Sequence, residues 1–334
     1  FGDHLGYYSL THPFPLMKVH KVYARKNAIW PFTVVGRPPQ EDTSFGQLIH
    51  EITGSAIPKE IPGVKEVHAV DAAGVHPLLL AIGSERYTPY QPTKQPAELL
   101  TIANHILGTG QLSLAKFLFI TSDDHNKLTT HDEAVFLQYV LERLHTDRDI
   151  HFHTNTTMDT LDYSGTGLNT GSKVVFAAYG DQVRILESEL PQELMNVSAF
   201  ADCRMIMPGV AAIQTKPYVD EQTTLEEIKH INDNLRGKTS QSFGVPLLIW
   251  CDDAKFTAQK LKNFLWVAFT RTNPSHDIFG IDEFYSHKHW GCNGPIILDA
   301  RIKPHHAPPV ELDPDMVKKT DRFFAAGGCL KGII

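Results

Sequence analysis

The feature that most constrains the fold is an order of elements that occurs twice along the chain. In residues 64–180, two short apolar segments precede an amphipathic helix pattern, a buried apolar segment that ends in acids, and a second helix pattern. Residues 197–303 show the same order. Corresponding positions, at offsets of 128 to 129 residues, are Asp123 and Asp252, Asp124 and Asp253, and Arg143 and Arg271. The spacing predicts a duplicated α/β unit whose strands form open sheets with helices packed on them.

The two acidic pairs follow the strands predicted at KFLFITSDD and VPLLIWCDD. Ligands of open α/β sheets gather at the carboxyl ends of strands, which favours a functional role for these acids. An acid after a strand also serves as the cap of the next helix. Both interpretations are open at this point.

The first residues, FGDHLGYYS, place Asp3 between Gly2 and His4, ahead of a Gly-Tyr-Tyr turn. A natural N-terminus is usually polar and poorly ordered, so we expect this chain to be the downstream part of a longer protein.

Residues 17–25 alternate apolar and polar side chains and predict a half-buried strand. From Ser44, the spacing predicts a helix whose apolar face belongs to the core; its members are Phe45, Leu48, Ile49 and Ile52.

Charge and cysteine content exclude several classes of protein. The chain has 334 residues, a net charge of −7 and a pI of about 6.2, so it offers no global basic surface for nucleic acid. No apolar run approaches the ~18 residues of a membrane span. The four cysteines form no CxxC pair, which favours free thiols in the reducing cytoplasm.

Two motifs near the start carry a resemblance to a known family. FGDHLGYYS and, after the predicted strand, RKNAIWPFTVVGRPPQED resemble two successive segments of the UbiD family of prenylated-flavin-dependent decarboxylases. The segments KFLFITSDD and RDIHFHTNTTMDTLDYSG resemble later elements of the same family, and FTRTNPSHD and HWGCNGPIILDARIKPHHAPP continue the likeness into the second unit.

The resemblance implies a domain order. In that family an N-terminal α/β region is followed by a split β-barrel that holds the flavin, a linker and a C-terminal α/β domain. We expect five regions here: the barrel end at 1–35, a linker with a helix at 36–63, the first α/β unit at 64–190, the second at 191–310, and a C-terminal helix and tail at 311–334.

The resemblance also implies an activity. The family decarboxylates aromatic or α,β-unsaturated acids, such as a polyprenyl-hydroxybenzoate, through prenylated FMN, with a divalent metal (Mn or Mg) and K. Asp3 matches the family's catalytic acid, which is often a glutamate. The family's cofactor and metal ligands precede the first residue of this chain, so we assign none here and expect no tightly bound flavin.

Further site residues follow from the same motifs. His4, Phe45 and Gly46 are candidates for a substrate cleft. Arg37 is expected to hold the linker by bidentate pairing with Glu41, Asp42 or another acid.

The histidines of HKHW (287–290) and PHHAPP (304–309) lack a completing acid or cysteine, so a proline-rich surface arm is favoured over a metal site.

The last 22 residues predict a helix with Asp313 as N-cap and Pro314 in its first turn, followed by an apolar end. This tail docks either on its own domain or on a neighbouring subunit, and we expect at least a homodimer.

Two other functions stay open: a non-catalytic assembly or substrate-cleft module that is inactive alone, and an unrelated metal hydrolase built on the acidic and histidine clusters.

Overall fold

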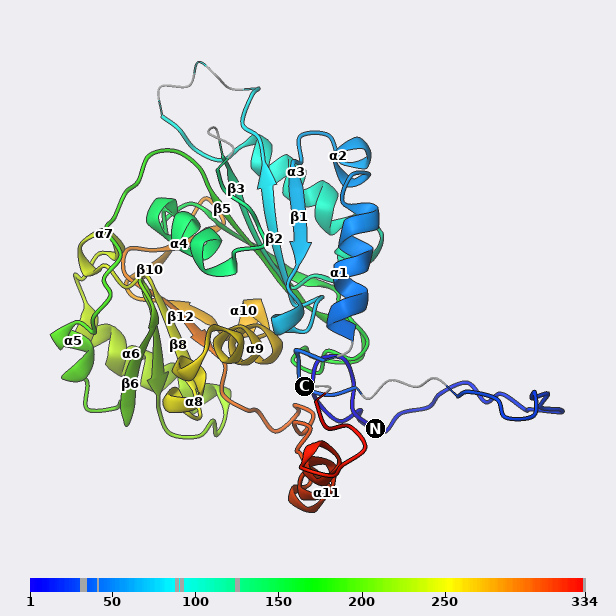
Figure 1. The fold of residues 1–334 in the computed structure, drawn as a ribbon. Helices are drawn as coiled ribbons and strands as arrows, with labels where there is room; N and C mark the ends of the chain where they lie inside the picture. Colours follow the sequence, from blue (N-terminus) through cyan, green and yellow to red (C-terminus); the bar gives the residue numbers. More distant parts are fainter. Residues whose placement is uncertain (31–34, 41, 88–89, 91–92, 124–126, 333–334) are drawn as a thin grey trace.

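In the computed structural model, which describes residues 1–30, 35–40, 42–87, 90, 93–123 and 127–332, the chain forms two five-stranded mixed sheets with helices packed around them (Figure 1). The prediction of an α/β fold is confirmed. Within the described residues, every helix is too short or too polar to cross a lipid bilayer.

The first sheet has the strand order β1-β2-β3-β5-β4. Its central strands are parallel, and each edge strand is antiparallel to its neighbour. The strands are β1 Glu66–Ala69, β2 Leu78–Gly83, β3 Phe117–Ser122, β4 Ile150–Thr157 and β5 Thr170–Ala178. Every residue of β2 and β3 is buried, as expected for parallel strands covered on both faces.

The second sheet repeats this arrangement with the order β6-β7-β8-β12-β9. Its parallel and antiparallel pairings fall in the same places as those of the first sheet. The strands are β6 Asp202–Met207, β7 Val210–Gln214, β8 Leu247–Cys251, β9 Ile278–Gly280 and β12 Ile296–Asp299. A hairpin of β10 Glu283–Ser286 and β11 His289–Cys292 lies between β9 and β12 in the chain. The shared topology supports the proposed duplication, and the exact domain boundaries stay predictions.

Helices connect and cover the strands. The longer ones are α1 Asp42–Thr53, α3 Glu98–Leu107, α4 Glu133–Arg143, α6 Glu221–Leu235, α9 Leu261–Arg271 and α11 Pro314–Phe324. The shorter ones are α2 Ile57–Glu60, α5 Gln192–Met195, α7 Ser240–Phe243, α8 Ala254–Gln259, α10 Pro274–Asp277 and the 3₁₀ turns η1 Asp71–Ala73 and η2 Gly110–Leu114.

Helix α9 joins the two units. Every residue from Asn263 to Arg271 is buried, because the helix is apolar on most of its circumference. Phe269 packs edge-on against Phe117 of the first sheet at 5.0 Å between ring centroids, and α9 also contacts β8 and β12 of the second. One hydrophobic cluster therefore extends through both units.

Two regions near the N-terminus differ from the sequence analysis. Residues 10–30, all of them described, form no strand and are exposed almost throughout, so the strand predicted at 17–25 is wrong (Figure 1). A strand needs a hydrogen-bonding neighbour, and none pairs with this segment in the described residues. The helix predicted from Ser44 is present as α1, but its apolar face is exposed rather than part of the core; Phe45, Leu48, Ile49 and Ile52 are all more than half exposed.

The C-terminal helix forms as predicted but stands away from the body (Figure 1). Asp313 accepts hydrogen bonds from the N–H groups of Asp315 and Met316, which confirms it as the N-cap. None of the residues of this fully described helix is buried. The docking of the helix on its own domain, one of the two alternatives, is therefore not what this structure shows. Ile333 and Ile334 lie outside the described residues.

Candidate active site

The N-terminal motif folds into a tight turn around Asp3. The N–H of Asp3 donates to the carbonyl of Tyr7 at 2.8 Å, and Gly2 pairs with Tyr8 across the turn. The carboxylate Oδ1 of Asp3 accepts the N–H groups of Leu5 at 3.0 Å and Tyr7 at 3.3 Å. Asp3 therefore organises the backbone that carries it.

Gly6 makes this turn possible. Its φ of +87° is in the left-handed region, which favours glycine. A Cβ at this position would lie 2.7 Å from Cα of Arg37, so the GRPP segment also packs directly against the turn.

The carboxyl group of Asp3 is set for proton chemistry. The residue is 2% exposed, and its Oδ2 has no hydrogen-bond partner among the described residues. Burial raises the pKa of Asp3 to about 6, against the opposing effect of the hydrogen bond from Tyr7. A carboxyl group with such a pKa exchanges its proton near neutral pH.

The second unit holds this turn in place. The indole N–H of Trp266 on α9 donates to the carbonyl of Leu5 at 2.8 Å, and the ring of Tyr7 stacks on Trp266 at 5.2 Å. The hydroxyl of Tyr7 lies 2.7 Å from Oγ1 of Thr270 and accepts from Nε of Arg271 at 3.2 Å. The position of Asp3 therefore depends on a helix more than 250 residues away in sequence.

The segment after β12 closes the other side of the turn. The N–H of Tyr8 donates to the carbonyl of Pro308 at 2.8 Å, and the N–H of Val310 donates to the carbonyl of Gly6 at 2.9 Å. The PHHAPP stretch thus supports the turn through its backbone, and it is not a free surface arm.

His4 points to a neighbouring carboxylate in the first unit. Its Nε2 lies 3.3 Å from Oδ2 of Asp159, and Nδ1 of His76 contacts the same oxygen. Burial alone would raise the pKa of Asp159, but the hydrogen bonds from His4 and His76 outweigh it and hold the pKa well below its usual range. Asp159 was not predicted as a site residue, and neither was His76.

Arg37, another predicted site residue, packs against the Asp3 turn, and its side chain reaches the second unit. The guanidinium of Arg37 lies over the rings of Phe256 and Trp266, at 5.0 and 5.2 Å from their centroids. Its predicted partner Glu41 lies outside the described residues, and the side chain of Asp42 is not described, so that pairing stays a prediction.

Phe45 and Gly46 lie on α1. Phe45 is 57% exposed, and the cleft assigned to this helix stays a prediction.

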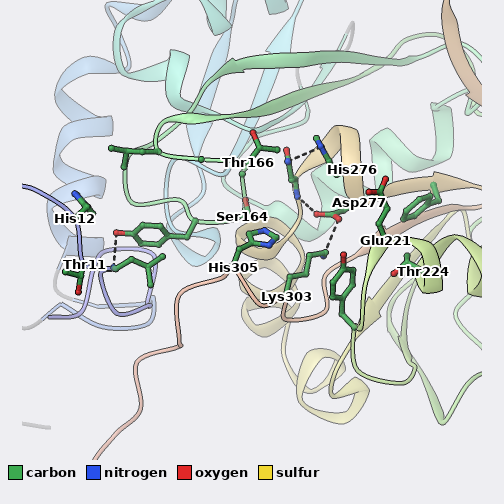
Figure 2. A pocket seen from close by; sticks show the side chains of 18 residues that line it. Thr11, His12, Ser164, Thr166, Glu221, Thr224, His276, Asp277, Lys303 and His305 are labelled. Carbon is green, nitrogen blue, oxygen red and sulfur yellow. Dashed lines mark hydrogen bonds and ion pairs between the residues drawn. The ribbon is translucent and has the colours of Figure 1, made fainter.

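A cavity of about 590 Å³ lies between the two units (Figure 2). On its floor, Nζ of Lys303 pairs with Oδ1 of Asp277 at 3.3 Å, while the N–H of Asn273 donates to Oδ2 of Asp277. Its lining comprises 10–12, 163–168, Tyr218, Glu221, Thr224, Asn273, His276, Asp277, Phe279, Lys303 and His305. Among the residues that the structure describes, none of the site residues predicted from the sequence lines it.

One member of the acidic pairs is a helix cap: Asp253 accepts the N–H of Phe256 at the start of α8. Oδ2 of Asp123 accepts the N–H of Leu128 in the loop before α4, whose N-cap is Asp132. Asp252 pairs with Arg271 at 3.3 Å. Asp124 lies outside the described residues.

Residues 10–30 of this chain offer a prenylated flavin no preformed wall. The segment 10–30, which would continue the barrel, leaves large apolar side chains open to solvent; Leu16 is 97% exposed. A cofactor site buries most of its ligand against preformed walls. No such wall faces Asp3 in the described residues of this segment.

Sequence reasoning missed the residues that fix the turn. His76 and Asp159 are 72 and 155 positions from His4, and Trp266 and Thr270 are farther still. No motif spacing connects such residues. Trp266 lies in a segment whose pattern predicts a helix, and that pattern does not point to a role beside Asp3.

Comparison with known proteins identifies the motifs. The family model of the 3-octaprenyl-4-hydroxybenzoate carboxy-lyase Rift-related domain matches residues 1–38, and that of the C-terminal domain of the same carboxy-lyase matches residues 43–178.

The chain is also similar to curated proteins. A Chlamydia pneumoniae protein described as a subunit of 4-hydroxybenzoate decarboxylase is 36% identical over 328 residues, which are 98% of this chain and 52% of that protein. An uncharacterized Archaeoglobus fulgidus protein is 29% identical over 174 residues, 52% of this chain and 34% of that protein. The chain thus spans about half the length of the Chlamydia relative, which shares the second unit as well.

Among solved structures, the open form of the Sedimentibacter hydroxybenzoicus vanillic acid decarboxylase is similar at a TM-score of 0.34 and 16% identity, over 60% of this chain and 36% of that one. This likeness is too low to support an argument, and the family assignment depends on the sequence matches. Because the two family models together match more than half of the chain, it belongs to the UbiD family of carboxy-lyases, as its sequence predicted.

Proposed function

We propose that this chain is the C-terminal part of a UbiD-type carboxy-lyase and that Asp3 is its proton donor. The observation that carries the proposal is the carboxyl group of Asp3, buried in the FGD turn with Oδ2 unpartnered among the described residues and its pKa raised to about 6. The family model that matches residues 1–38 covers this turn.

The residues of this chain would hold and move one proton. Oδ1 of Asp3 is occupied by two backbone N–H groups, which leaves Oδ2 to carry the proton and deliver it to the carbon that loses CO₂. Trp266, Tyr7 and the 308–310 segment keep that oxygen in one place. Precise placement matters because an error of about 1 Å in a reacting group can cost ~10²-fold in rate.

The cofactors are proposed for the full-length protein. Solved UbiD-class relatives are described in complex with FMN or prenylated FMN. We infer that prenylated FMN, a divalent metal (Mn or Mg) and K are held mainly by parts of the protein outside residues 1–334. Prenylated FMN would supply the activation of the carboxylic acid.

The substrate class is an aromatic carboxylic acid. The matching family model is that of a 3-octaprenyl-4-hydroxybenzoate carboxy-lyase, and the Chlamydia relative is described as part of a 4-hydroxybenzoate decarboxylase.

We also propose a cytoplasmic location, supported by four free cysteines.

A second candidate role is an assembly module, which the exposed apolar faces favour. The described part of α1 and all of α11 leave Phe45, Ile49, Met316 and Phe323 exposed. Exposed apolar patches of this kind mark protein contact sites. We propose that the chain forms at least a homodimer through α11, whether or not it is active alone.

The activity is tested in the full-length protein loaded with prenylated FMN. Incubation with 4-hydroxybenzoate, 3,4-dihydroxybenzoate and vanillate in D₂O should release CO₂ from at least one acid and place deuterium at the carbon that carried it. A flavin-loaded protein that releases no CO₂ from a wide panel of aromatic acids would favour the assembly role instead.

A further inference from the structure

Three potential metal ligands from distant parts of the chain meet beside the Asp3 turn. His4 comes from the turn, His76 from the loop that leads into β2, and Asp159 from the loop after β4. Their ligand atoms, Nε2 of His4, Nδ1 of His76 and a carboxylate oxygen of Asp159, all lie within 4.8 Å of one another. No other group of three such side chains is as compact among the residues that the structure describes.

The geometry presents these atoms toward one point. Oδ1 of Asp159 accepts the N–H of Leu161 at 2.9 Å, which fixes the carboxylate and turns Oδ2 toward both imidazoles. The rings of His4 and His76 stand edge to face at 5.5 Å between centroids. Ligands at about 2.0–2.2 Å from a tetrahedral zinc ion are roughly 3.5 Å apart, and Nε2 of His4 already lies 3.3 Å from Oδ2 of Asp159. Nδ1 of His76 is hydrogen-bonded to the same oxygen at closer range, so an ion has to replace that hydrogen bond when it binds.

Burial and charge also suit a cation. The side chains of His4 and His76 are about one-fifth exposed, at 23% and 22%, while Nε2 of His4 itself is buried. The carboxylate of Asp159 supplies negative charge, and its side chain is only 9% exposed. A partly buried site strengthens the attraction between a cation and that charge.

We propose that His4, His76 and Asp159 bind one divalent transition-metal ion of the Zn²⁺ class, with a water molecule in the open position. The ion would clip the N-terminal turn to the first α/β unit. Two imidazoles and one carboxylate favour Zn²⁺ or Co²⁺ over Mg²⁺ and Ca²⁺, which prefer oxygen ligands. This site is separate from the flavin-linked metal of the proposed function and does not depend on that function.

The test measures metal binding by the purified, untagged chain of residues 1–334. After removal of metal with a chelator, Zn²⁺ uptake is measured by calorimetry and by elemental analysis, and Co²⁺ is added as a spectroscopic probe. We expect one Zn²⁺ per chain, no competition from millimolar Mg²⁺, and visible Co²⁺ absorption typical of a nitrogen and oxygen ligand set.

Two ligand variants and one matched control locate the ion. Asp159→Asn and His76→Gln should each weaken Zn²⁺ binding by at least tenfold, since even partners outside the ligand shell typically contribute about 10–100-fold. His131→Gln should leave the affinity unchanged. His131 belongs to a second histidine group with His50 and His68, whose ring centroids are 4.4 to 6.1 Å apart, so it is the main competing site.

Each alternative result overturns the proposal. No Zn²⁺ uptake by the wild-type chain would show that the three side chains are only hydrogen-bonded to one another. Loss of binding in His131→Gln with normal binding in Asp159→Asn would place the ion at the other group. Circular dichroism and thermal unfolding without metal check that each variant is folded. Should Asp159→Asn not fold, His4→Gln replaces it and must show the same loss.

Discussion

Trp266 should control whether the Asp3 turn stays closed. In the variant Trp266→Phe, the carbonyl of Leu5 loses the indole N–H that donates to it at 2.8 Å. Leu5 is 2% exposed, so water cannot readily replace that donor. An unsatisfied buried acceptor costs about 1–3 kcal/mol, and the smaller ring adds about 1 kcal/mol through lost packing against Tyr7.

The hydrogen-bond loss alone predicts a measurable opening of the turn. Since each 1.4 kcal/mol is a factor of ten, a cost of about 1–3 kcal/mol raises the opening constant by about 5- to 150-fold. The N–H groups of Leu5 and Tyr7, which donate to Asp3, should therefore exchange with deuterium faster by that factor. Hydrogen exchange of an N-terminal peptide, read by mass spectrometry, measures this directly.

Trp290→Phe is the matched control. Trp290 is also buried, but its indole N–H donates to the exposed Glu283 of the β10–β11 hairpin at 3.2 Å. Water can replace it there, and the hairpin is remote from the turn in sequence. Equal exchange of residues 1–8 in the two variants would refute the claim that α9 holds the turn.

Three other predictions concern the pH dependence of stability, the flavin content and the oligomeric state. Burial raises the pKa of Asp149 to about 6 from an unfolded value of 3.8. The contribution of this residue to stability is therefore largest below pH 4 and is lost as pH rises toward 6 and above. In Asp149→Asn, the urea concentration at the midpoint of unfolding should vary less with pH between pH 4 and 7, and an unchanged dependence on pH would contradict this. The purified chain of 334 residues should carry no stoichiometric flavin, because residues 10–30 form no wall around Asp3; visible flavin absorbance in the preparation would show the reverse. Deleting 313–334 should weaken a dimer while the α/β core stays folded, since α11 exposes Met316 and Phe323; light scattering that finds the intact chain monomeric, or the dimer unaffected by the deletion, would rule out this role.

The local sequence pattern predicted the central strands of both sheets. The segments that became β3 and β8 are continuous apolar runs, and such runs form buried strands wherever two helices or units cover them. The order of elements along the second unit followed from its agreement with the first. Asp253 and Asp313 act as helix caps because a carboxylate at that position can accept free backbone N–H groups.

Patterns that depend on a partner were misleading. The alternation at 17–25 describes a strand only if another strand pairs with it, and α1 has an apolar face that the described residues do not cover. The helix pattern that follows VPLLIWCDD in the second unit, at AQKLKNFLWVAFTR, forms two helices divided at Lys260, where the side-chain amide of Asn263 donates to the carbonyl of Phe256. Nothing in the local sequence signals that break.

Of the residues at the candidate site, only Asp3 and His4 were named from the sequence, because one contiguous motif contains both. The residues around it meet through tertiary contacts: Trp266 and Thr270 through α9, and His76 and Asp159 through loops of the first sheet. The pairing of Arg37 with Glu41 or Asp42 stays a prediction, and its guanidinium lies on aromatic rings of the second unit. A planar cation pairs with either partner, and only the fold decides which is near.

The role of Asp3 is tested most directly by Asp3→Asn in the full-length, flavin-loaded enzyme, with Asp3→Glu as the conservative control. The amide can still accept the N–H groups of Leu5 and Tyr7, so the turn keeps its shape, but it cannot give and recover a proton. We expect CO₂ release to fall by ~10²–10⁴-fold while flavin content and substrate binding are retained, and Asp3→Glu to keep measurable turnover. Turnover of Asp3→Asn within a factor of about two of wild type, only ~0.4 kcal/mol of barrier, would remove Asp3 from the reaction.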